Sequence, residues 1–423
     1  MDTYDFSSSR ALLERASRVI PGGIYGHYGL AMITPETPLY FSKAEGSHFV
    51  DVDGNRFIDY MCAYGPSILG YNHPVVDAAA REQVNRGNTV TLSSPVMVEL
   101  AERLVELITI ADWAFFAKNG GDVTNLATLV AKAATGRKKI VKINGGYHGV
   151  APWMLDPGSG GTVDEDFANI VSIDWNSISQ LEQAISDHKG EIAGFISTPY
   201  HSPVFQDNVL PEEGYWVAVE NLCHREGIVL IVDDVRAGFR IHLRGSNEFF
   251  GFKPDLICLG KALANGYPIS ALVGTDVLRE AVQGVFCTGT MYFGSAPMAA
   301  ALANITELMK NDAAELINQT GRKLADGLTR VAADNGFDLK VSGPCSMPYL
   351  RITNNDDTTL HYDWIARCVK RGAYFLPYHN HFISTAHTDS DIEETLGIAN
   401  DAFQSMKQCG STPMAILDYQ KKL

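Results

Sequence analysis

Hydrophobic and polar positions alternate along the middle of the chain with two different periods. Apolar residues recur every three or four positions over residues 98–108 and 123–135, which predicts two amphipathic helices, the second stopped by Gly136. Short apolar runs typical of buried strands lie at residues 113–116, 139–143, 193–196, 228–232 and 256–259. Strands that alternate with helices predict an α/β fold, a mostly parallel sheet covered by helices.

The two ends of the chain have a different pattern. Residues 47–60 predict two strands around a turn at Asp53-Gly54-Asn55, and from about Met309 helical patterns alternate with strand-like pieces such as residues 347–352. We therefore expect three segments. They are an N-terminal segment of a small domain (1–70), a large cofactor-binding domain (71–308) and a C-terminal part of the small domain (309–423).

Composition and charge narrow the class of protein. The 423 residues are 46% hydrophobic and 20% charged, as in soluble globular proteins of two or three domains. The formal net charge of −15 argues against nucleic acid and against anionic membrane surfaces as partners. The chain has no apolar run of about 18 residues, its acidic start does not resemble a signal peptide, and its seven cysteines are scattered. We expect a cytoplasmic protein with free thiols and no membrane contact.

Two polar residues follow neighbouring apolar runs and suggest a chemistry. Asp233 ends the run at 228–232, and Lys261 comes after Gly260 at the end of the run at 256–259. Ligand sites in parallel sheets collect at the carboxyl ends of strands. A lysine that can form a Schiff base and an aspartate that can keep a ring nitrogen protonated are what a pyridoxal phosphate (PLP) enzyme needs.

A glycine-containing turn offers a place for the phosphate of such a cofactor. Asn119-Gly120-Gly121-Asp122 joins the run at 113–116 to the helix at 123–135, and the first amides of a helix attract anions. We expect Asp122 to be the N-cap of that helix, with its side chain turned onto backbone amides. After the next strand, Tyr147 could lie on the cofactor ring or only cover a loop, and a structural role is favoured for His148.

Several further motifs, in this order, resemble the class III (fold type I) PLP-dependent aminotransferases, and especially their glutamate-1-semialdehyde aminomutase-like subgroup. The resemblance covers nearly the whole chain. The matching motifs lie at residues 21–23 (PGG), 51–60 (DVDGN and IDY), 64–74 (YGPSILG and HP), 135–140 (TGRKKI), 147–149 (YHG), 233–240 (DDV and GFR) and 386–388 (AHT).

The resemblance implies a fold and roles for individual residues. It implies a mainly parallel seven-stranded sheet with helices on both faces and a smaller α+β domain built from the chain ends. Lys261 looks like the Schiff-base lysine and proton carrier, Asp233 like the partner of the pyridine nitrogen, and Val235 and Tyr147 like the residues below and above the ring. The residues implied to hold the cofactor are Asn119, Gly120, Gly121, Asp122, Tyr147, His148, Asp233, Val235, Lys261 and Thr290.

The family forms homodimers with shared active sites, in which a threonine or serine of the other subunit completes the phosphate site. Counting forward from Gly289 selects Thr290 for this role, whereas counting back from Pro297 selects Tyr292. We favour Thr290. No metal ion is expected at the site.

The substrate side departs from the aminomutase pattern. Residues 24–29, directly after Pro21-Gly22-Gly23, contain no arginine, Tyr64 replaces the tryptophan of the substrate pocket, and the segments around His201 and His379 differ from those of the family. Tyr64, His201 and His379 are therefore candidate substrate residues, although the two histidines near residue 380 could also form an ordinary polar turn. For Arg236 we expect a surface or interface role rather than substrate binding.

These features predict an aminotransferase that moves an amino group between an amine or amino acid and a keto or aldehyde acceptor through Lys261. An aminomutase or an amino-acid racemase on the same cofactor is the alternative. Small-molecule substrates are the expected partners, and no residue names the donor or the acceptor.

Overall fold

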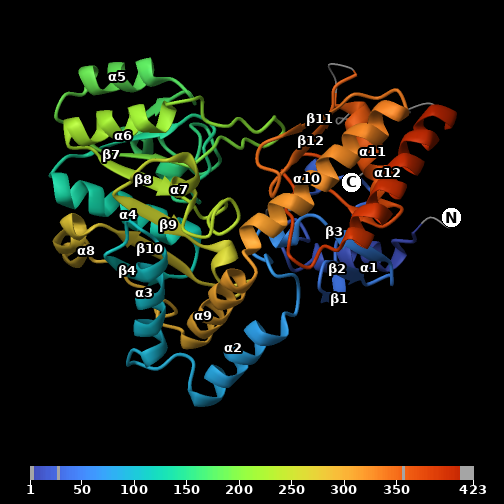
Figure 1. Ribbon diagram of the computed structural model, residues 1–423, viewed down its shortest axis with the longest axis horizontal. Helices are drawn as coiled ribbons and strands as arrows, with labels where there is room; N and C mark the ends of the chain where they lie inside the picture. Colours follow the sequence, from blue (N-terminus) through green and yellow to red (C-terminus); the bar gives the residue numbers. More distant parts are fainter. Residues whose placement is uncertain (1–3, 26–28, 355–357, 410–423) are drawn as a thin grey trace. The chain divides into compact units, whose positions relative to one another are not determined.

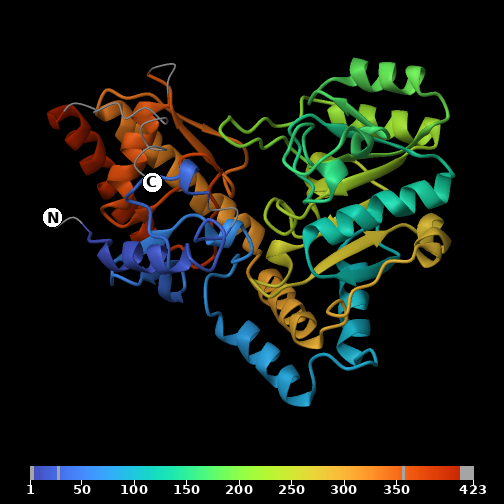
Figure 2. The same cartoon turned by 180° about the vertical axis from the view of Figure 1, so that it is seen from behind.

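The chain folds into two compact units, described by a computed structural model for residues 4–25, 29–354 and 358–409. The first unit contains Met1–His73, Val204–Asn208 and Leu316–Leu423, and the second contains Pro74–Pro203 and Val209–Glu315. Figure 1 labels many of the elements of both units, and Figure 2 shows the same ribbon from behind. The large apolar sheet and all the residues expected to hold the cofactor belong to the second unit.

A seven-stranded sheet forms the centre of the second unit, in the order β4-β10-β9-β8-β7-β5-β6. The strands from β9 to β6 are parallel, and β10 is antiparallel to both of its neighbours. The strand bounds are Trp113–Ala117 (β4), Lys139–Ile143 (β5), Ile170–Ile173 (β6), Ile192–Ser197 (β7), Val229–Asp233 (β8), Leu256–Leu259 (β9) and Ser270–Gly274 (β10). The expected α/β class and mainly parallel sheet are confirmed.

Helices cover both faces of this sheet. On one face α4 packs in a buried cluster with the sheet, and on the other face α5 and α6 do so. The helices of this unit are α2 (Pro74–Arg86), α3 (Pro95–Leu107), α4 (Gly120–Thr135), α5 (Ile178–Asp187), α6 (Tyr215–Glu226), α7 (Ser246–Phe250), α8 (Arg279–Gly284) and α9 (Ser295–Lys310). Both helices predicted from the apolar period, now α3 and α4, are present.

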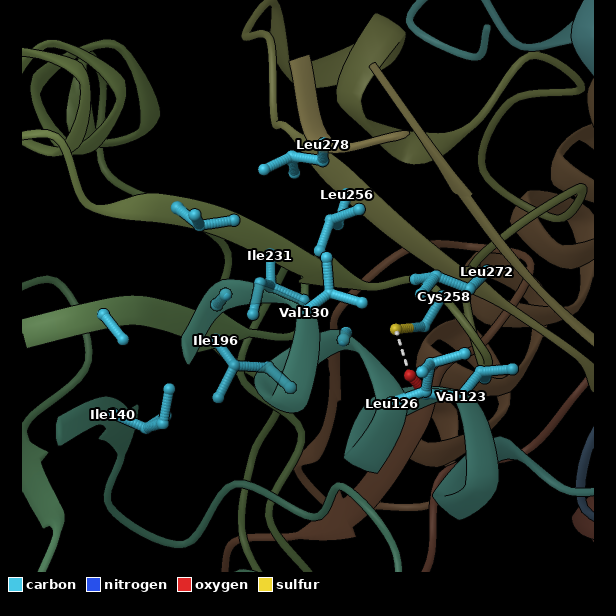
Figure 3. Close-up of a cluster of buried hydrophobic side chains, with 14 of the residues drawn as sticks. Val123, Leu126, Val130, Ile140, Ile196, Ile231, Leu256, Cys258, Leu272 and Leu278 are labelled. Carbon is cyan, nitrogen blue, oxygen red and sulfur yellow. Dashed lines mark hydrogen bonds between the residues drawn. The ribbon is translucent and has the colours of Figure 1, made fainter. Parts of the chain in front are cut away.

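The central strand β8 shows why the sequence has a continuous apolar run there. Ile231 points into the cluster around α4, whereas Leu230 and Val232 point into the cluster around α6. Figure 3 shows the first cluster, in which Val123 of α4 lies against Cys258 of β9. Because side chains alternate between two buried faces, every position of the strand must be apolar until Asp233 ends it.

The first unit is built from the two ends of the chain and a short piece of its middle. It contains a four-stranded sheet in the order β1-β2-β3-β13 and a two-stranded sheet of β11 and β12. Its strands are β1 (Phe41–Glu45), β2 (His48–Asp51), β3 (Arg56–Asp59), β11 (Leu339–Ser342), β12 (Tyr349–Ile352) and β13 (Ala373–Tyr374). Its helices are α1 (Ser7–Ala16), most of α10 (Ala313–Asp334), α11 (Thr359–Val369) and α12 (Asp389–Cys409).

Short 3₁₀ turns connect several elements, at Leu30–Met32, Cys62–Tyr64, Pro152–Met154, Asp164–Phe167, Lys261–Leu263 and Asp276–Leu278. Within the described part of the chain, no helix is long and apolar enough to cross a membrane. Six cysteines are free thiols, most of them buried, and the side chain of Cys409 lies outside the described ones.

Candidate active site

The two residues with the strongest chemical signal lie at the same edge of the large sheet. Asp233 is the last residue of β8, and Lys261 follows the end of β9 by two residues. The two strands are parallel neighbours, with Asp233 opposite Cys258 in the register. Lys261 and Asp233 interact electrostatically, so the fold brings them together at the carboxyl ends of adjacent strands.

Lys261 occupies a strained and desolvated position. Its backbone has a φ of 43°, in the left-handed region that lysine rarely adopts. Burial, and after it the positive charges of Arg236 and Arg240, lower the pKa of its ammonium group, the negative charge of Asp233 opposes them, and the net result is a pKa of about 7. A lysine with such a pKa exists partly as the neutral amine near neutral pH, which is the nucleophilic form.

The Asp233 carboxylate is held by two groups. Its Oδ1 accepts a hydrogen bond from the amide of Val235 at 3.2 Å, and its Oδ2 lies 2.8 Å from Nδ1 of His148. Because a carboxylate accepts, Nδ1 of His148 carries the proton. Nε2 of His148 is buried, with no hydrogen-bond partner among the described residues.

The turn between β4 and α4 has the geometry expected of an anion site, with one correction. The N-cap of α4 is Asn119, not Asp122, because the helix already begins at Gly120. The Asp122 side chain does turn onto backbone amides, as expected, and accepts from Asn119 at 2.7 Å and from Lys118 at 3.2 Å. The first helical amides, which lack partners inside a helix, therefore belong to Gly120 and Gly121.

Close packing requires glycine at position 120 of this turn and at position 149 of the next loop. A Cβ on Gly120 would lie 2.8 Å from Cγ1 of Val235, and a Cβ on Gly149 would lie 2.7 Å from Cα of Gly121. The turn and the 145–149 loop therefore approach each other through their backbones. Thr124 ties them together, since its hydroxyl donates to the carbonyl of His148 at 2.6 Å.

A second hydrogen bond that holds this turn comes from β10, a strand that the sequence analysis did not predict. The hydroxyl of Ser270, the first residue of β10, donates to the carbonyl of Asn119 at 2.8 Å. Sequence analysis missed Ser270 and Thr124, because a single hydroxyl in an apolar segment carries no recognisable pattern.

The other expected cofactor residues lie in the same unit. Tyr147 is 49% exposed in the loop that also holds His148. Thr290 is exposed, whereas Tyr292 is partly buried and its hydroxyl interacts with the Asp122 carboxylate of its own chain. Val235 fits between the turn and the lysine segment, because a Cβ on Gly260 would also lie 3.2 Å from its Cγ1.

The expected substrate residues are divided between the units. In the first unit, the hydroxyls of Tyr64 and Tyr378 are 2.9 Å apart, and the rings of Tyr64 and His379 meet edge to face at 5.2 Å. Nδ1 of His379 lies 2.7 Å from the carbonyl of Asn380. Residues 62–64 all have positive φ values, which is unusual for residues other than glycine. Tyr64 therefore belongs to a left-handed turn.

His201 belongs to the second unit, where its ring stacks at 6.0 Å on Trp175 and burial lowers its pKa. Residues 26–28, part of the segment where the family arginine is missing, lie outside the described residues. Within the described ranges, no cluster of His, Cys, Asp and Glu has the arrangement of a metal site.

The arrangement fits PLP. A partly buried, desolvated lysine and a buried aspartate share one strand edge, and a turn with no room for a side chain at Gly120 presents helical amides in the same unit. The amine can attack an aldehyde, the carboxylate can accept from a protonated ring nitrogen, and the amides can bind a phosphate.

Comparison with known proteins agrees with this geometry. The sequence profile of the family "Aminotransferase class-III" matches residues 31–403. The aminopentol aminotransferase of Sphingopyxis macrogoltabida is 41% identical over 395 residues, which are 93% of each chain. A glutamate-1-semialdehyde 2,1-aminomutase of Syntrophobacter fumaroxidans is 30% identical over 426 residues, covering 95% of this chain and 98% of the relative.

A solved structure is similar over the same length. The FumI protein of Sphingopyxis sp. MTA144, determined in its PLP internal aldimine form, superposes with a TM-score of 0.94 at 40% identity, over 96% of this chain and 99% of that one. The recognised resemblance, the fold type I architecture and the expected cofactor are thereby confirmed. The chain belongs to the class-III aminotransferase family and is a PLP-dependent transaminase.

Proposed function

We propose that this transaminase uses Lys261 as its reactive amine and Asp233 as the partner of the cofactor ring nitrogen. The observation that carries the proposal is a desolvated lysine, with a pKa of about 7, in electrostatic contact with a buried carboxylate at the next strand end. When bound, PLP supplies an aldehyde and a protonated ring that accepts electrons.

The chain's own residues would divide the remaining work. Asp233, fixed by His148 and the amide of Val235, would hold the proton on the ring nitrogen through a charge-assisted hydrogen bond. Lys261 would take a proton from the substrate carbon and return it to the cofactor carbon, because a pKa near the working pH suits both directions. The amides of Gly120 and Gly121 would hold the phosphate.

Substitution of the two residues tests these roles. We expect Lys261→Ala to remove the absorbance of the lysine-linked cofactor and nearly all turnover, and Asp233→Asn to reduce the rate strongly while the fold is preserved. Absorbance, circular dichroism and single-turnover rates measure these effects. A Lys261→Ala variant that keeps both absorbance and turnover would refute the assignment.

We also infer the class of amine donor. The name of the 41% identical relative denotes an amine that carries hydroxyl groups. Residues 24–29, directly after Pro21-Gly22-Gly23, contain no arginine, and the candidate substrate residues Tyr64 and His379, with Tyr378 beside Tyr64, supply hydroxyl and imidazole groups. These groups can hydrogen-bond to the hydroxyl groups of a hydroxylated primary amine.

A donor screen separates these possibilities and also tests the reaction type. We expect amino alcohols to convert the enzyme to its pyridoxamine phosphate form faster than alanine or glutamate, with pyruvate as acceptor. Faster conversion by amino acids would contradict the donor class. Product formation without consumption of a keto acid would instead indicate an aminomutase, and loss of stereochemistry alone a racemase.

We further propose a cytoplasmic homodimer. Six thiols without disulfide bonds among the described residues suit a reducing compartment. Thr290 is exposed and therefore accessible to a partner subunit, whereas Tyr292 interacts with its own chain. Sedimentation of the purified enzyme tests the dimer, and loss of PLP affinity in Thr290→Ala but not in Tyr292→Phe would support the role of Thr290.

A further inference from the structure

Arg236 lies directly beside the proposed catalytic residues. It follows Val235, whose side chain fills the space between Gly120 of the phosphate turn and Gly260, the residue before Lys261. Its side chain is partly buried. A cation is therefore placed at the carboxyl edge of the sheet, next to the reactive lysine.

Ser202 orients the Arg236 guanidinium. Nη1 donates to Oγ of Ser202 at 2.7 Å and lies 3.5 Å from the carbonyl of the same residue. The Ser202 hydroxyl also interacts with the hydroxyl of Tyr200, which is 1% exposed and whose pKa is raised to about 12 by burial. These contacts fix the direction of one edge of the guanidinium.

The charge of Arg236 reaches the reactive centre. After burial, Arg236 is the largest influence that lowers the pKa of Lys261, ahead of Arg240. The two groups therefore share an environment in which electrostatic interactions are strong. The molecule as a whole has a net charge of −15, which repels anions at long range, so an anionic substrate would need a local cation of this kind.

We propose that Arg236, oriented by Ser202, binds the carboxylate of the keto acid that accepts the amino group. The proposal rests on transamination at Lys261, as proposed above. A planar guanidinium matches a carboxylate with two parallel hydrogen bonds. It would give the acceptor an anchor that a hydroxylated amine does not use, so that donor and acceptor share one site but are recognised by different residues.

Two acceptors that differ in the carboxylate test the proposal. Holoenzyme in its pyridoxamine phosphate form is mixed with pyruvate or with propanal, and single-turnover rates are compared for wild type, Arg236→Gln and Arg244→Gln. Arg244 is an exposed arginine of the same segment and gives the same change of charge. In Arg236→Gln we expect kcat/KM for pyruvate to fall roughly 10- to 100-fold, the loss of a charged hydrogen-bonding partner, with propanal changed less than about threefold.

A binding measurement provides a second readout. Oxamate resembles pyruvate but cannot accept an amino group, so calorimetry of oxamate binding to the holoenzyme reports carboxylate recognition alone. We expect Arg236→Gln to weaken oxamate binding, Arg236→Lys and Ser202→Ala to weaken it less, and Arg244→Gln to leave it unchanged.

The outcomes separate this proposal from the proposed function. Equal losses for pyruvate and propanal in Arg236→Gln, or unchanged oxamate binding, would overturn the role of Arg236. Inability of the wild-type enzyme to form pyridoxamine phosphate from any amine would instead overturn the reaction at Lys261, while oxamate binding would still report on Arg236.

Discussion

At the scale of single residues, Lys261 derives its chemistry from where the fold holds it. Most lysines lie in water, where the ammonium form dominates up to a pH of about 10. Burial and two nearby arginines favour the neutral amine of Lys261, and Asp233 favours the ammonium form. The pKa of about 7 is the balance of these opposing effects.

This balance predicts a pH profile in the cofactor-free protein. Because the neutral amine reacts, the rate at which acetic anhydride labels Lys261 should rise with pH through about 7. The rate at which it labels exposed lysines should rise only near pH 10. Mass spectrometry of the Lys261 peptide measures the profile. Arg236→Gln removes a cation and should move the midpoint up, and Asp233→Asn removes an anion and should move it down. A midpoint near that of surface lysines would contradict the desolvated position.

The sequence indicates some of these residues better than others. Asp233 and Lys261 can be predicted because each ends an apolar strand, and parallel strands place such ends together. The contact between His148 and Asp233 joins residues 85 positions apart, and the pairing of Arg236 with Ser202 joins residues 34 positions apart. Periodicity describes neighbours along one element, so it contains no information about contacts of this kind.

At the scale of elements, the start of α4 depends on glycine at position 120. A Cβ there would lie 2.8 Å from Cγ1 and 3.1 Å from Cγ2 of Val235, and Val235 cannot retreat freely because it also contacts Gly260. Alanine in a helix is otherwise favoured over glycine by about 1 kcal/mol. The clash is the larger effect, since overpacking typically costs about 1–3 kcal/mol and here moves the amides that we propose bind the phosphate.

We therefore expect Gly120→Ala to weaken PLP binding about tenfold or more and to lower the melting temperature. In a Val235→Ala background, which removes both clashing methyl groups, the same substitution should cost much less. Gly284→Ala, at a helical glycine with open space around it, is the control. PLP titration by fluorescence measures the affinities. An equal loss in both backgrounds would show that Val235 is not the obstacle.

The large sheet also shows where pattern-based prediction stops. The strands from β7 to β9 were predicted because both of their faces are buried and every position is apolar. β6 and β10 were missed. β10 reads Ser-Ala-Leu-Val-Gly, and its Gly274 is required because a Cβ would lie 2.5 Å from Trp113 and 2.6 Å from Leu256. Small residues selected by such close packing do not produce a recognisable strand pattern.

At the scale of the whole molecule, the chain passes more than once between its two compact units. The segment Val204–Asn208 belongs to the first unit, although its neighbours on both sides belong to the second. Nothing in its composition indicates this, since it has no regular structure and its assignment depends on distant partners. The domain limits expected from the sequence, at residues 70/71 and 308/309, place residues 204–208 inside the large domain. These limits stay predictions.

Asp207 fastens this segment to the first unit. Its carboxylate accepts two hydrogen bonds from Arg351, at 2.9 and 2.7 Å, and pairs with Lys340 at 2.7 Å. The amide of Phe205 donates to the carbonyl of Tyr378 at 2.9 Å, and the two rings lie 5.6 Å apart. Tyr378 in turn meets Tyr64, so the segment supports a candidate substrate residue.

Loss of the Asp207 charge should release the segment. The carboxylate is partly exposed, so we expect Asp207→Asn to cost about 1 kcal/mol and to raise chymotrypsin cleavage after Phe205, which is 42% exposed, about fivefold at pH 7. Asp326→Asn, at an exposed carboxylate of α10, is the control. Mass spectrometry of the cleavage products gives the cleavage rate after Phe205 in each variant. Equal rates in the two variants would contradict the proposal that the Asp207 carboxylate holds this segment in place.

The pH dependence of the same variant follows from the direction of one shift. The Arg351 hydrogen bond lowers the pKa of Asp207 below its ordinary value of 3.8 in the folded protein. A carboxyl group with a lowered folded pKa stabilises the fold fully above its unfolded pKa, and this stabilisation is lost as the pH falls through the folded value. The difference in unfolding free energy between wild type and Asp207→Asn should therefore be constant from about pH 5 to pH 8 and shrink only in stronger acid. Urea unfolding across this range measures it. A difference that already disappears near pH 6 would mean that a group other than Asp207, with a higher pKa, controls the attachment of this segment.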